Sequence, residues 1–187
     1  MARGTVFQSD AQVDNALWVN RSRTDAMDAL SNITVRLGTT ADASFVVQCN
    51  IQLARETENL SLEIGNVRRG VDAVLTDHAK GFYLIAEIDG RLAGQLLITY
   101  EWSDWRNGMF WWIQSVYTVP ELRHRGVFQG LYSEVERLAR QAGTVCGLRL
   151  YVAATNVEAQ KIYGLCKLHQ TDYLLFERDD VLSRSMG

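Results

Sequence analysis

The sequence predicts an α/β (α+β) fold in which a mixed, mostly antiparallel central sheet carries helices on both faces, in the order β-α-α-β-β-β-α-β-α-β. Apolar residues recur with period two in some segments and with helical spacing in others, which indicates alternating strands and helices. Two dipeptides typical of tight hairpin turns, Asp89-Gly90 and Asn107-Gly108, separate three consecutive strands and so predict antiparallel pairing. Around Gly126 a strand leads through a helix to another strand, and such a unit is parallel and right-handed.

Composition places the chain among ordinary globular proteins. It has 187 residues, of which 47% are hydrophobic, enough for one domain with a sizeable core. Its net charge is -3, from 19 basic and 22 acidic residues, which provides no electrostatic footprint for nucleic acid. We expect the domain at residues 32–178 and a tail at 179–187. Residues 1–31 have weak helical spacing, so we expect an extension that is mobile or forms short helical turns and could support a homodimer.

The cysteines, histidines and apolar runs exclude several other classes of protein. The 3 cysteines form no CxxC pair and leave an odd thiol, which suits a reducing cytoplasm. The 3 histidines are widely spaced and suggest no metal cluster. No apolar run reaches about 18 residues, and the amino terminus has no apolar signal-peptide core. The sequence therefore predicts a cytoplasmic protein without a metal ion, a membrane span or a nucleic-acid partner.

The first half of the domain is predicted from periodicity and turn residues. Alternating apolar residues predict a strand, helical spacing then predicts two helices, and two β-rich runs flank the Asp89-Gly90 turn. A loop at 102–106 and the Asn107-Gly108 turn lead into the central stretch. The expected elements are a strand at 32–37, a helix at about 42–58, a helix within 63–78, and strands at 82–88 and about 91–101.

The central stretch runs from Met109 to Ala142. Aromatic and β-branched residues at 109–119, closed by Pro120, predict a buried strand. After a short basic turn, apolar residues at helical spacing predict a helix. Gly143 ends this pattern, as glycine often does in the position after a helix.

Three further elements are expected after the central helix. Alternation predicts a strand at 148–152. Asn156 is a good N-cap for the next helix, which carries Ala159 and Tyr163 on one apolar face. A last strand is expected at about 172–177.

The turn before the central helix contains Arg123, His124, Arg125 and Gly126. The first N–H groups of a helix have no partner inside it, and the helix start carries partial positive charge. A glycine lets a ligand approach the backbone, so a phosphate or pyrophosphate is expected here. The stretch matches neither G-x-x-x-x-G-K-[ST] nor G-x-G-x-x-G, since Gly130 follows Gly126 after three residues. A solvated turn that is merely basic is the alternative.

Two motifs and the element order resemble one known family. The segment from Val119 to Phe128 is similar to V-x-P-x-x-R-x-x-G-x-G/A, and Asn156, Ala159 and Tyr163 are similar to N-x-x-A-x-x-x-Y in the helix that follows. With these features the chain resembles the GNAT superfamily of acetyl-CoA-dependent N-acetyltransferases. The resemblance covers about residues 33–177 and implies a GNAT-like sheet.

The chain departs from the family pattern at two positions. Phe128 stands where the family usually has glycine or alanine, so its benzyl group must point away from a ligand on the backbone. Lys167 stands where a glycine commonly ends the family's next helix, which affects the exit from that helix.

The resemblance implies that the pyrophosphate of acetyl-CoA sits on the turn at the helix start, held mainly by backbone N–H donors. The pantetheine arm would pair with exposed backbone of the central strand, and a bulge near Gln114-Ser115 would open that slot. An ordinary core strand is the alternative. The residues implied to bind acetyl-CoA are Val116, Tyr117, Thr118, Val119, Arg123, His124, Arg125, Gly126, Val127, Phe128, Gln129, Gly130 and Asn156.

The chemistry implied by the resemblance is direct attack of a primary amine on the thioester in a ternary complex. Tyr163 matches the family's tyrosine that protonates the departing sulfur, although an aromatic on a helix face also suits a core. The general base stays open: Glu101 and Asp104 lie beside tryptophans, and Glu56 or Glu58 could serve instead. A transferase for longer acyl chains and a non-catalytic acyl-CoA-binding module are the alternatives.

Overall fold

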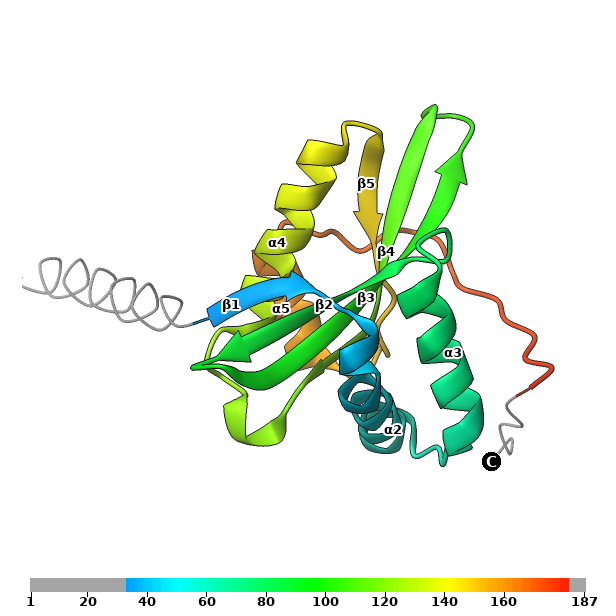
Figure 1. The fold of residues 1–187 in the computed structure, drawn as a ribbon. Helices are drawn as coiled ribbons and strands as arrows, with labels where there is room; N and C mark the ends of the chain where they lie inside the picture. The colour runs from blue at the N-terminus through cyan, green and yellow to red at the C-terminus, as the bar shows by residue number, and fades with distance from the viewer. Residues whose placement is uncertain (1–32, 182–187) are drawn as a thin grey trace, which may run out of the picture. The chain divides into compact units, whose positions relative to one another are not determined.

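The computed structural model describes residues 33–181, which form two compact units. The first unit ends at Tyr151 and the second begins at Val152. Figure 1 labels their helices and strands. The described elements of the first unit are β1 (Ile33–Leu37), η1 (Thr40–Asp42), α2 (Ala43–Glu58), α3 (Ile64–Thr76), β2 (Phe82–Ile88), β3 (Arg91–Ser103), β4 (Gly108–Thr118), η2 (Pro120–Leu122), α4 (Val127–Ala142) and β5 (Val145–Arg149). The second unit contains α5 (Val157–Leu165). The expected extension at 1–31 lies outside the described residues.

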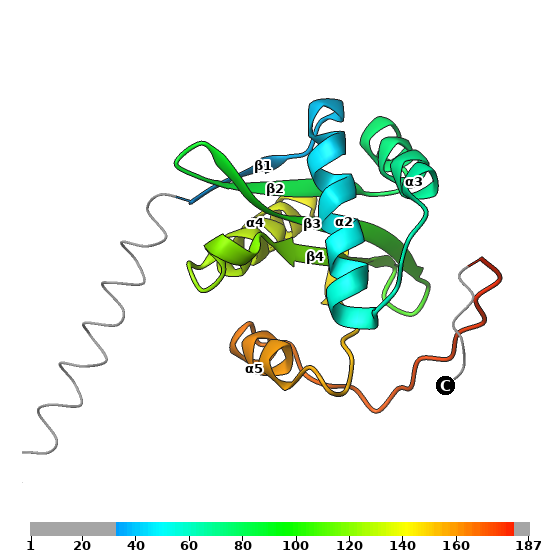
Figure 2. The same cartoon turned by 90° about the horizontal axis from the view of Figure 1, so that it is seen from below.

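The described strands form one sheet in the order β1-β2-β3-β4-β5. The first three pairings are antiparallel, and β4 pairs with β5 in parallel. Helices α2 and α3 cover one face of this sheet, and α4 covers the other (Figure 2). The predicted mixed, mostly antiparallel sheet with helices on both faces is confirmed.

Neighbouring residues of β3 point to opposite faces of the sheet. Gly94 faces α4, because a Cβ there would lie 2.9 Å from Val127 Cγ1. Gln95 faces α2, where its side chain donates to Asn50 Oδ1 at 3.0 Å. The missing side chain at Gly94 therefore lets the start of α4 lie directly on the sheet. On the opposite face the core contains Ala43, Val46, Val47, Val71, Leu75, Tyr83 and Ile85.

The two hairpins follow the predicted turn residues. Asp89 has φ 52° and Gly90 has φ 73°, the left-handed conformation that a two-residue turn needs. In the second hairpin Asn107 has φ 46°, and Gly108 already belongs to β4. The predicted loop at 102–106 is too long at its start, because β3 continues to Ser103 opposite Gly108.

The predicted strand at 148–152 is displaced, since β5 runs from Val145 to Arg149. Its limits follow from its parallel register with β4, in which Val145 lies opposite Met109. Gly147 packs against Phe110, where a Cβ would lie 2.5 Å from ring atom Cε1. The strand was predicted from alternating apolar side chains, and this pattern did not include Gly147.

The predicted strand at 172–177 is wrong. Among residues 152–181 the structure describes no strand, and the apolar run from Tyr173 to Phe176 is exposed. Aromatic and aliphatic side chains favour strands because they fit a half-buried pleated surface next to another strand. Within the second unit no described strand offers such a partner, so the run stays irregular.

An ion pair ties the end of β1 to the start of α2. The Arg36 guanidinium donates to both carboxylate oxygens of Asp42 at 2.8 Å and to Glu87 Oε1 at 2.8 Å. Asp42 is only 5% exposed and also accepts from the Thr39 N–H group at 2.8 Å. The hydrogen bond from Arg36 is the main cause that lowers the pKa of Asp42 to about 2.

We expect Asp42→Asn to reduce the free energy of unfolding by about 2 kcal/mol at pH 7, because the charged partner of Arg36 is lost. A folded-state pKa below the unfolded value of about 3.9 stabilises the protein above that pH. The difference between wild type and variant should therefore be constant above about pH 4 and shrink as pH falls toward 2. Urea unfolding across this range measures it. Asp72→Asn, at an exposed position of α3, is the matched control and should change stability by less than about 0.5 kcal/mol.

Candidate active site

One side of β4 is only partly paired. On the β3 side its ladder extends from Gly108 to Thr118. On the β5 side it pairs only from Met109 to Trp112. From Ile113 onward, residues 33–151 provide no strand partner on that side. This backbone can therefore receive another extended chain.

A bulge interrupts β4 within this open segment. The register with β3 changes from Gln95 opposite Tyr117 to Leu97 opposite Gln114. Ser115 lies inside the interruption and has φ 49°. A bulge bends its strand and increases the local twist. The predicted bulge near Gln114-Ser115 is confirmed.

The basic turn after β4 contains two left-handed residues, His124 with φ 60° and Gly126 with φ 83°. Gly126 is the N-cap of α4, and no side chain caps this helix start. Among the described residues, the N–H groups of His124, Arg125 and Gly126 donate to no backbone oxygen. The side chains of His124 and Arg125 are exposed. Unpaired N–H groups beside a positive helix end form a site suited to an anion such as phosphate.

Arg123 lies beside this turn but is bound elsewhere. Its Nη2 donates to Glu56 Oε2 at 2.6 Å, and its Nε donates to the Thr118 carbonyl at 3.2 Å. The Tyr117 hydroxyl donates to Glu56 Oε1 at 2.7 Å, and burial, followed by this bond, raises the pKa of Tyr117 to about 12. Glu56 thus joins α2 to the end of β4 and neutralises Arg123. The role of Arg123 in binding a ligand stays a prediction.

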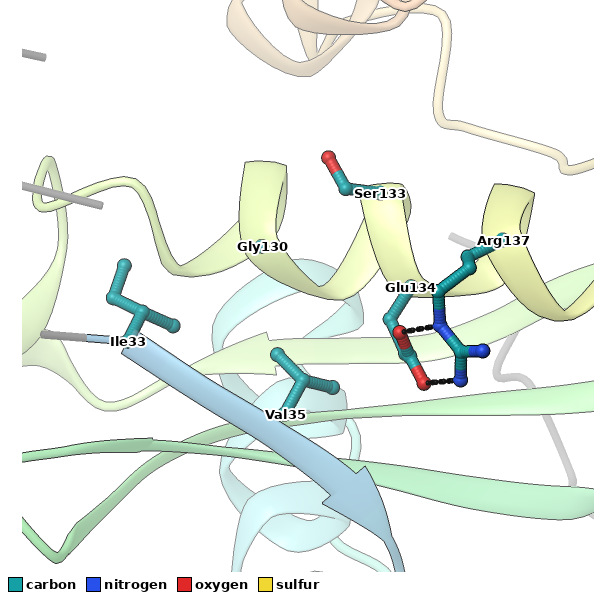
Figure 3. A pocket seen from close by; sticks show the side chains of 6 residues that line it. All are labelled: Ile33, Val35, Gly130, Ser133, Glu134 and Arg137. Atoms are coloured by element: carbon teal, nitrogen blue, oxygen red, sulfur yellow. Dashed lines mark hydrogen bonds and ion pairs between the residues drawn. The ribbon is translucent and has the colours of Figure 1, made fainter. Parts of the chain in front are cut away.

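Gly130 faces β1 within α4. A Cβ there would lie 3.1 Å from Ile33 Cγ2, and the Gly130 N–H group already donates to the Gly126 carbonyl at 3.0 Å. Gly130 therefore supports the packing of α4 on β1, and its predicted contact with a ligand is not tested. A groove of about 280 Å³ lies beside it (Figure 3). This groove is lined by Ile33, Val35, Gly130, Ser133, Glu134 and Arg137.

Phe128 packs against a second aromatic side chain of α4, and its orientation relative to a bound ligand stays a prediction. Its ring lies 5.9 Å from the ring of Tyr132, one turn further along α4. Val127 is 2% exposed and packs inward. The side chains at the start of α4 thus fill space along the helix and on the sheet.

Glu101 is a paired carboxylate. Its Oε1 accepts from Arg149 Nη1 at 2.6 Å, and its Oε2 accepts from Trp112 Nε1 at 2.5 Å. The hydrogen bond from Trp112 is the first cause that lowers the pKa of Glu101. The Arg149 guanidinium also lies 3.8 Å from the centre of the Phe110 ring. Both carboxylate oxygens are occupied, which weakens Glu101 as a proton acceptor.

The remaining base candidates are Asp104, Glu58 and Glu56. Asp104 lies in the turn between β3 and β4, where its carboxylate accepts from the Trp105 N–H group at 2.9 Å. Glu58 is the exposed last residue of α2. Glu56 has a lowered pKa, first because of its bond from Tyr117. The general base stays a prediction.

The second unit holds the other two candidate residues. Asn156 caps α5, as predicted, because its Oδ1 accepts from the Ala159 N–H group at 3.1 Å. Tyr163 is half-buried on α5, and burial raises its pKa. Lys167 has φ 61°, so the left-handed turn that often carries glycine is made here by a lysine.

Sequence reasoning missed a buried glutamine and its polar partner in the first unit. Gln95 is fully buried on β3 and is bound to Asn50 on α2 and to the Ser115 carbonyl. The signal that could have found it is a glutamine at an inward position of an otherwise apolar strand.

Within residues 33–181, no group of three or more histidine, cysteine or acidic side chains is placed to hold a metal ion. None of the helices described there is both long and apolar enough to cross a membrane.

The comparisons with known proteins agree on one family. The model of the acetyltransferase (GNAT) family matches residues 51–166, more than half of the chain. No curated protein matches the sequence. A possible acetyltransferase from Clostridium difficile 630 is similar in structure, with 35% sequence identity and a TM-score of 0.74 over 80% of this chain and 99% of that one.

Two more distant structures share the fold. A predicted acetyltransferase from Clostridium acetobutylicum, solved with acetyl-CoA, has 18% identity and a TM-score of 0.63, over 78% of this chain and 96% of that one. An aminoglycoside N-acetyltransferase in complex with CoA has 14% identity and a TM-score of 0.64, over 80% of this chain and 95% of that one.

The family match makes the chain an acyltransferase with an acyl-CoA cosubstrate. The chain belongs to the GNAT acetyltransferase family.

We expect Gly126→Ala to weaken CoA binding about tenfold or more, because a Cβ strains the left-handed backbone and covers the N–H groups. The matched control is Gly143→Ala, at the other end of α4, where φ is 67° and nothing lies within 4 Å of an added Cβ. Both changes should cost about 1–2 kcal/mol of stability. Calorimetry with CoA should separate them, and equal dissociation constants would contradict the assigned anion site.

Proposed function

We propose that the protein is an N-acetyltransferase that moves an acetyl group from acetyl-CoA to a primary amine. The observation that carries this proposal is the combination of an unpaired β4 edge with a left-handed basic turn at the start of α4. The β4 edge can pair with an extended arm that carries amide groups, and the turn can bind a pyrophosphate. Acetyl-CoA has both parts.

The cosubstrate would be held mainly by backbone groups. In this proposal the pyrophosphate accepts from N–H groups between His124 and the first turn of α4, and the exposed Arg125 side chain adds charge. The pantetheine arm lies along the open side of β4, from Val116 to Val119. Each hydrogen bond to the charged pyrophosphate contributes about 1.5–3 kcal/mol. Because Glu56 neutralises Arg123, this proposal assigns no direct contact between Arg123 and the pyrophosphate.

The reaction would be direct attack of a neutral amine on the thioester carbonyl. A C–N bond forms, the C–S bond breaks, and the sulfur leaves as a thiolate that takes a proton. Tyr163 is the proposed donor of that proton. A tyrosine phenol is protonated at neutral pH, as a general acid requires, and burial raises the pKa of Tyr163 further. No acyl-enzyme intermediate is needed.

The proton released by the amine requires a base. Glu56 and Glu101 each accept two hydrogen bonds from side chains of the first unit, which lowers their pKa values. A carboxylate in that state binds an additional proton weakly. We therefore favour Asp104 over Glu101 as the residue that attracts the amine at the hairpin, with proton transfer to water.

A panel of primary amines with acetyl-CoA tests this function. We expect one class of amine to release free CoA thiol at a rate well above hydrolysis, and calorimetry to give a dissociation constant below about 1 mM for CoA. Longer acyl-CoA thioesters in the same assay define the acyl chain. If the folded protein binds no acyl-CoA at millimolar concentration, the proposal fails.

We expect Tyr163→Phe to reduce kcat by about 10²–10⁴-fold, because the hydroxyl that protonates the thiolate is removed. The dissociation constant for acetyl-CoA should stay nearly unchanged, since the pyrophosphate site lies in the first unit. Tyr173→Phe, which removes an exposed hydroxyl from the same unit, is the control. Full turnover by Tyr163→Phe would remove this residue from the mechanism.

A further inference from the structure

The buried side chain of Gln95 holds the bulge of β4. Its Nε2 donates to the Ser115 carbonyl and, at 3.0 Å, to Asn50 Oδ1. A carbonyl oxygen can only accept, so the nitrogen of the Gln95 amide must face Ser115. The contact thus fixes the orientation of both groups.

This contact also sets the direction of the next N–H group. No peptide bond in the described residues is cis. In a planar trans peptide the carbonyl and the following N–H point in opposite directions. Because the Ser115 carbonyl points to Gln95 on β3, the Val116 N–H points away from β3.

Stability alone does not explain a glutamine at this position. Gln95 Oε1 is buried and has no hydrogen-bond partner within the described chain. A buried acceptor in that state costs about 1–3 kcal/mol, which offsets much of the stabilisation that the bonds to the Ser115 carbonyl and Asn50 Oδ1 provide. What the glutamine adds is the donor to Ser115.

We propose that Gln95 is a positioning residue of the acyl-transfer site. By holding the Ser115 carbonyl toward the Gln95 side chain, it holds the Val116 N–H on the side away from β3, where β4 has no described strand partner beyond Trp112. There the N–H donates to the carbonyl oxygen of the bound thioester as negative charge develops on it. This inference rests on the proposed function.

Gln95→Met tests the role of the donor. Methionine has a similar size and length but cannot bind the Ser115 carbonyl, so we expect kcat to fall about 10- to 100-fold. The dissociation constant for CoA should change by less than about threefold, since the pyrophosphate turn is untouched. The free energy of unfolding should fall by no more than about 1–3 kcal/mol, because the Ser115 carbonyl and Asn50 Oδ1 lose their donor, so the variant stays folded in the assay. A kcat within about twofold of wild type would overturn the proposal.

Thr99→Val is the matched control on the same strand, β3. The Thr99 hydroxyl accepts from the Gln114 amide at 2.5 Å and does not bind the Ser115 carbonyl. The control variant should keep kcat within about twofold of wild type. An equal loss in both variants would mean that any change of a polar side chain along β3 slows the reaction, which would overturn a specific role for Gln95.

Gln95→Glu adds a pH readout that packing alone does not produce. A carboxylate cannot donate to Ser115, whereas a protonated carboxyl can, and burial raises the pKa of such a group. We expect kcat relative to wild type to rise as pH falls from about 9 to about 6. If kcat of Gln95→Glu stays close to that of wild type at every pH while Gln95→Met is slow, the carboxyl stays protonated and donates to Ser115. That result also supports the proposal. A ratio that stays low at every pH would contradict it.

A measurement without substrate separates this inference from the proposed function. In the ligand-free protein, Gln95→Met should shift the amide resonances of Ser115 and Val116 and leave those of α4 in place. If wild type acetylates no amine but these resonances shift, the proposed function fails and the bulge support stands. Unchanged resonances at both positions would overturn the proposal whatever the activity.

Discussion

The site depends on where the backbone pairing of β4 stops. A buried N–H or C=O group must find a partner, and in a sheet the neighbouring strands supply it. On the β5 side of β4, pairing ends at Trp112, although β4 continues to Thr118. The unpaired groups beyond Trp112 are available to a ligand with amides of its own.

Helix α2 supports β4 where β5 does not. Asn50 and Gln95 connect α2 to the bulge, and Glu56 connects it to Tyr117 and Arg123 at the strand's end. These polar links also decide the local charge. Because Glu56 neutralises Arg123, the proposed anion site depends mainly on backbone N–H groups and the helix start, whose contribution does not require a flexible side chain.

The sequence predicted those features that local chemistry decides. Asp89-Gly90 predicted a two-residue turn, and Gly126 predicted the start of α4, where it is the left-handed N-cap. The strand at 172–177 was wrong because β propensity is expressed only beside a partner strand. Gln95 and the pairing of Arg123 with Glu56 were missed because residues far apart in the chain create them, and a single sequence does not contain that register.

Residues with positive φ mark the positions where the backbone is strained unless the residue type or its surroundings allow that conformation. Asn and Asp adopt this conformation readily, so Asp89 and Asn107 in the hairpins need no further support. Ser115 has no such tendency, and holding it at φ 49° costs about 1–3 kcal/mol unless its surroundings compensate. Gln95 supplies that compensation through the Ser115 carbonyl. A strained residue and its buried support thus occur together at the point of β4 where the thioester is proposed to bind, and a backbone donor fixed in this way needs little reorganisation during the reaction.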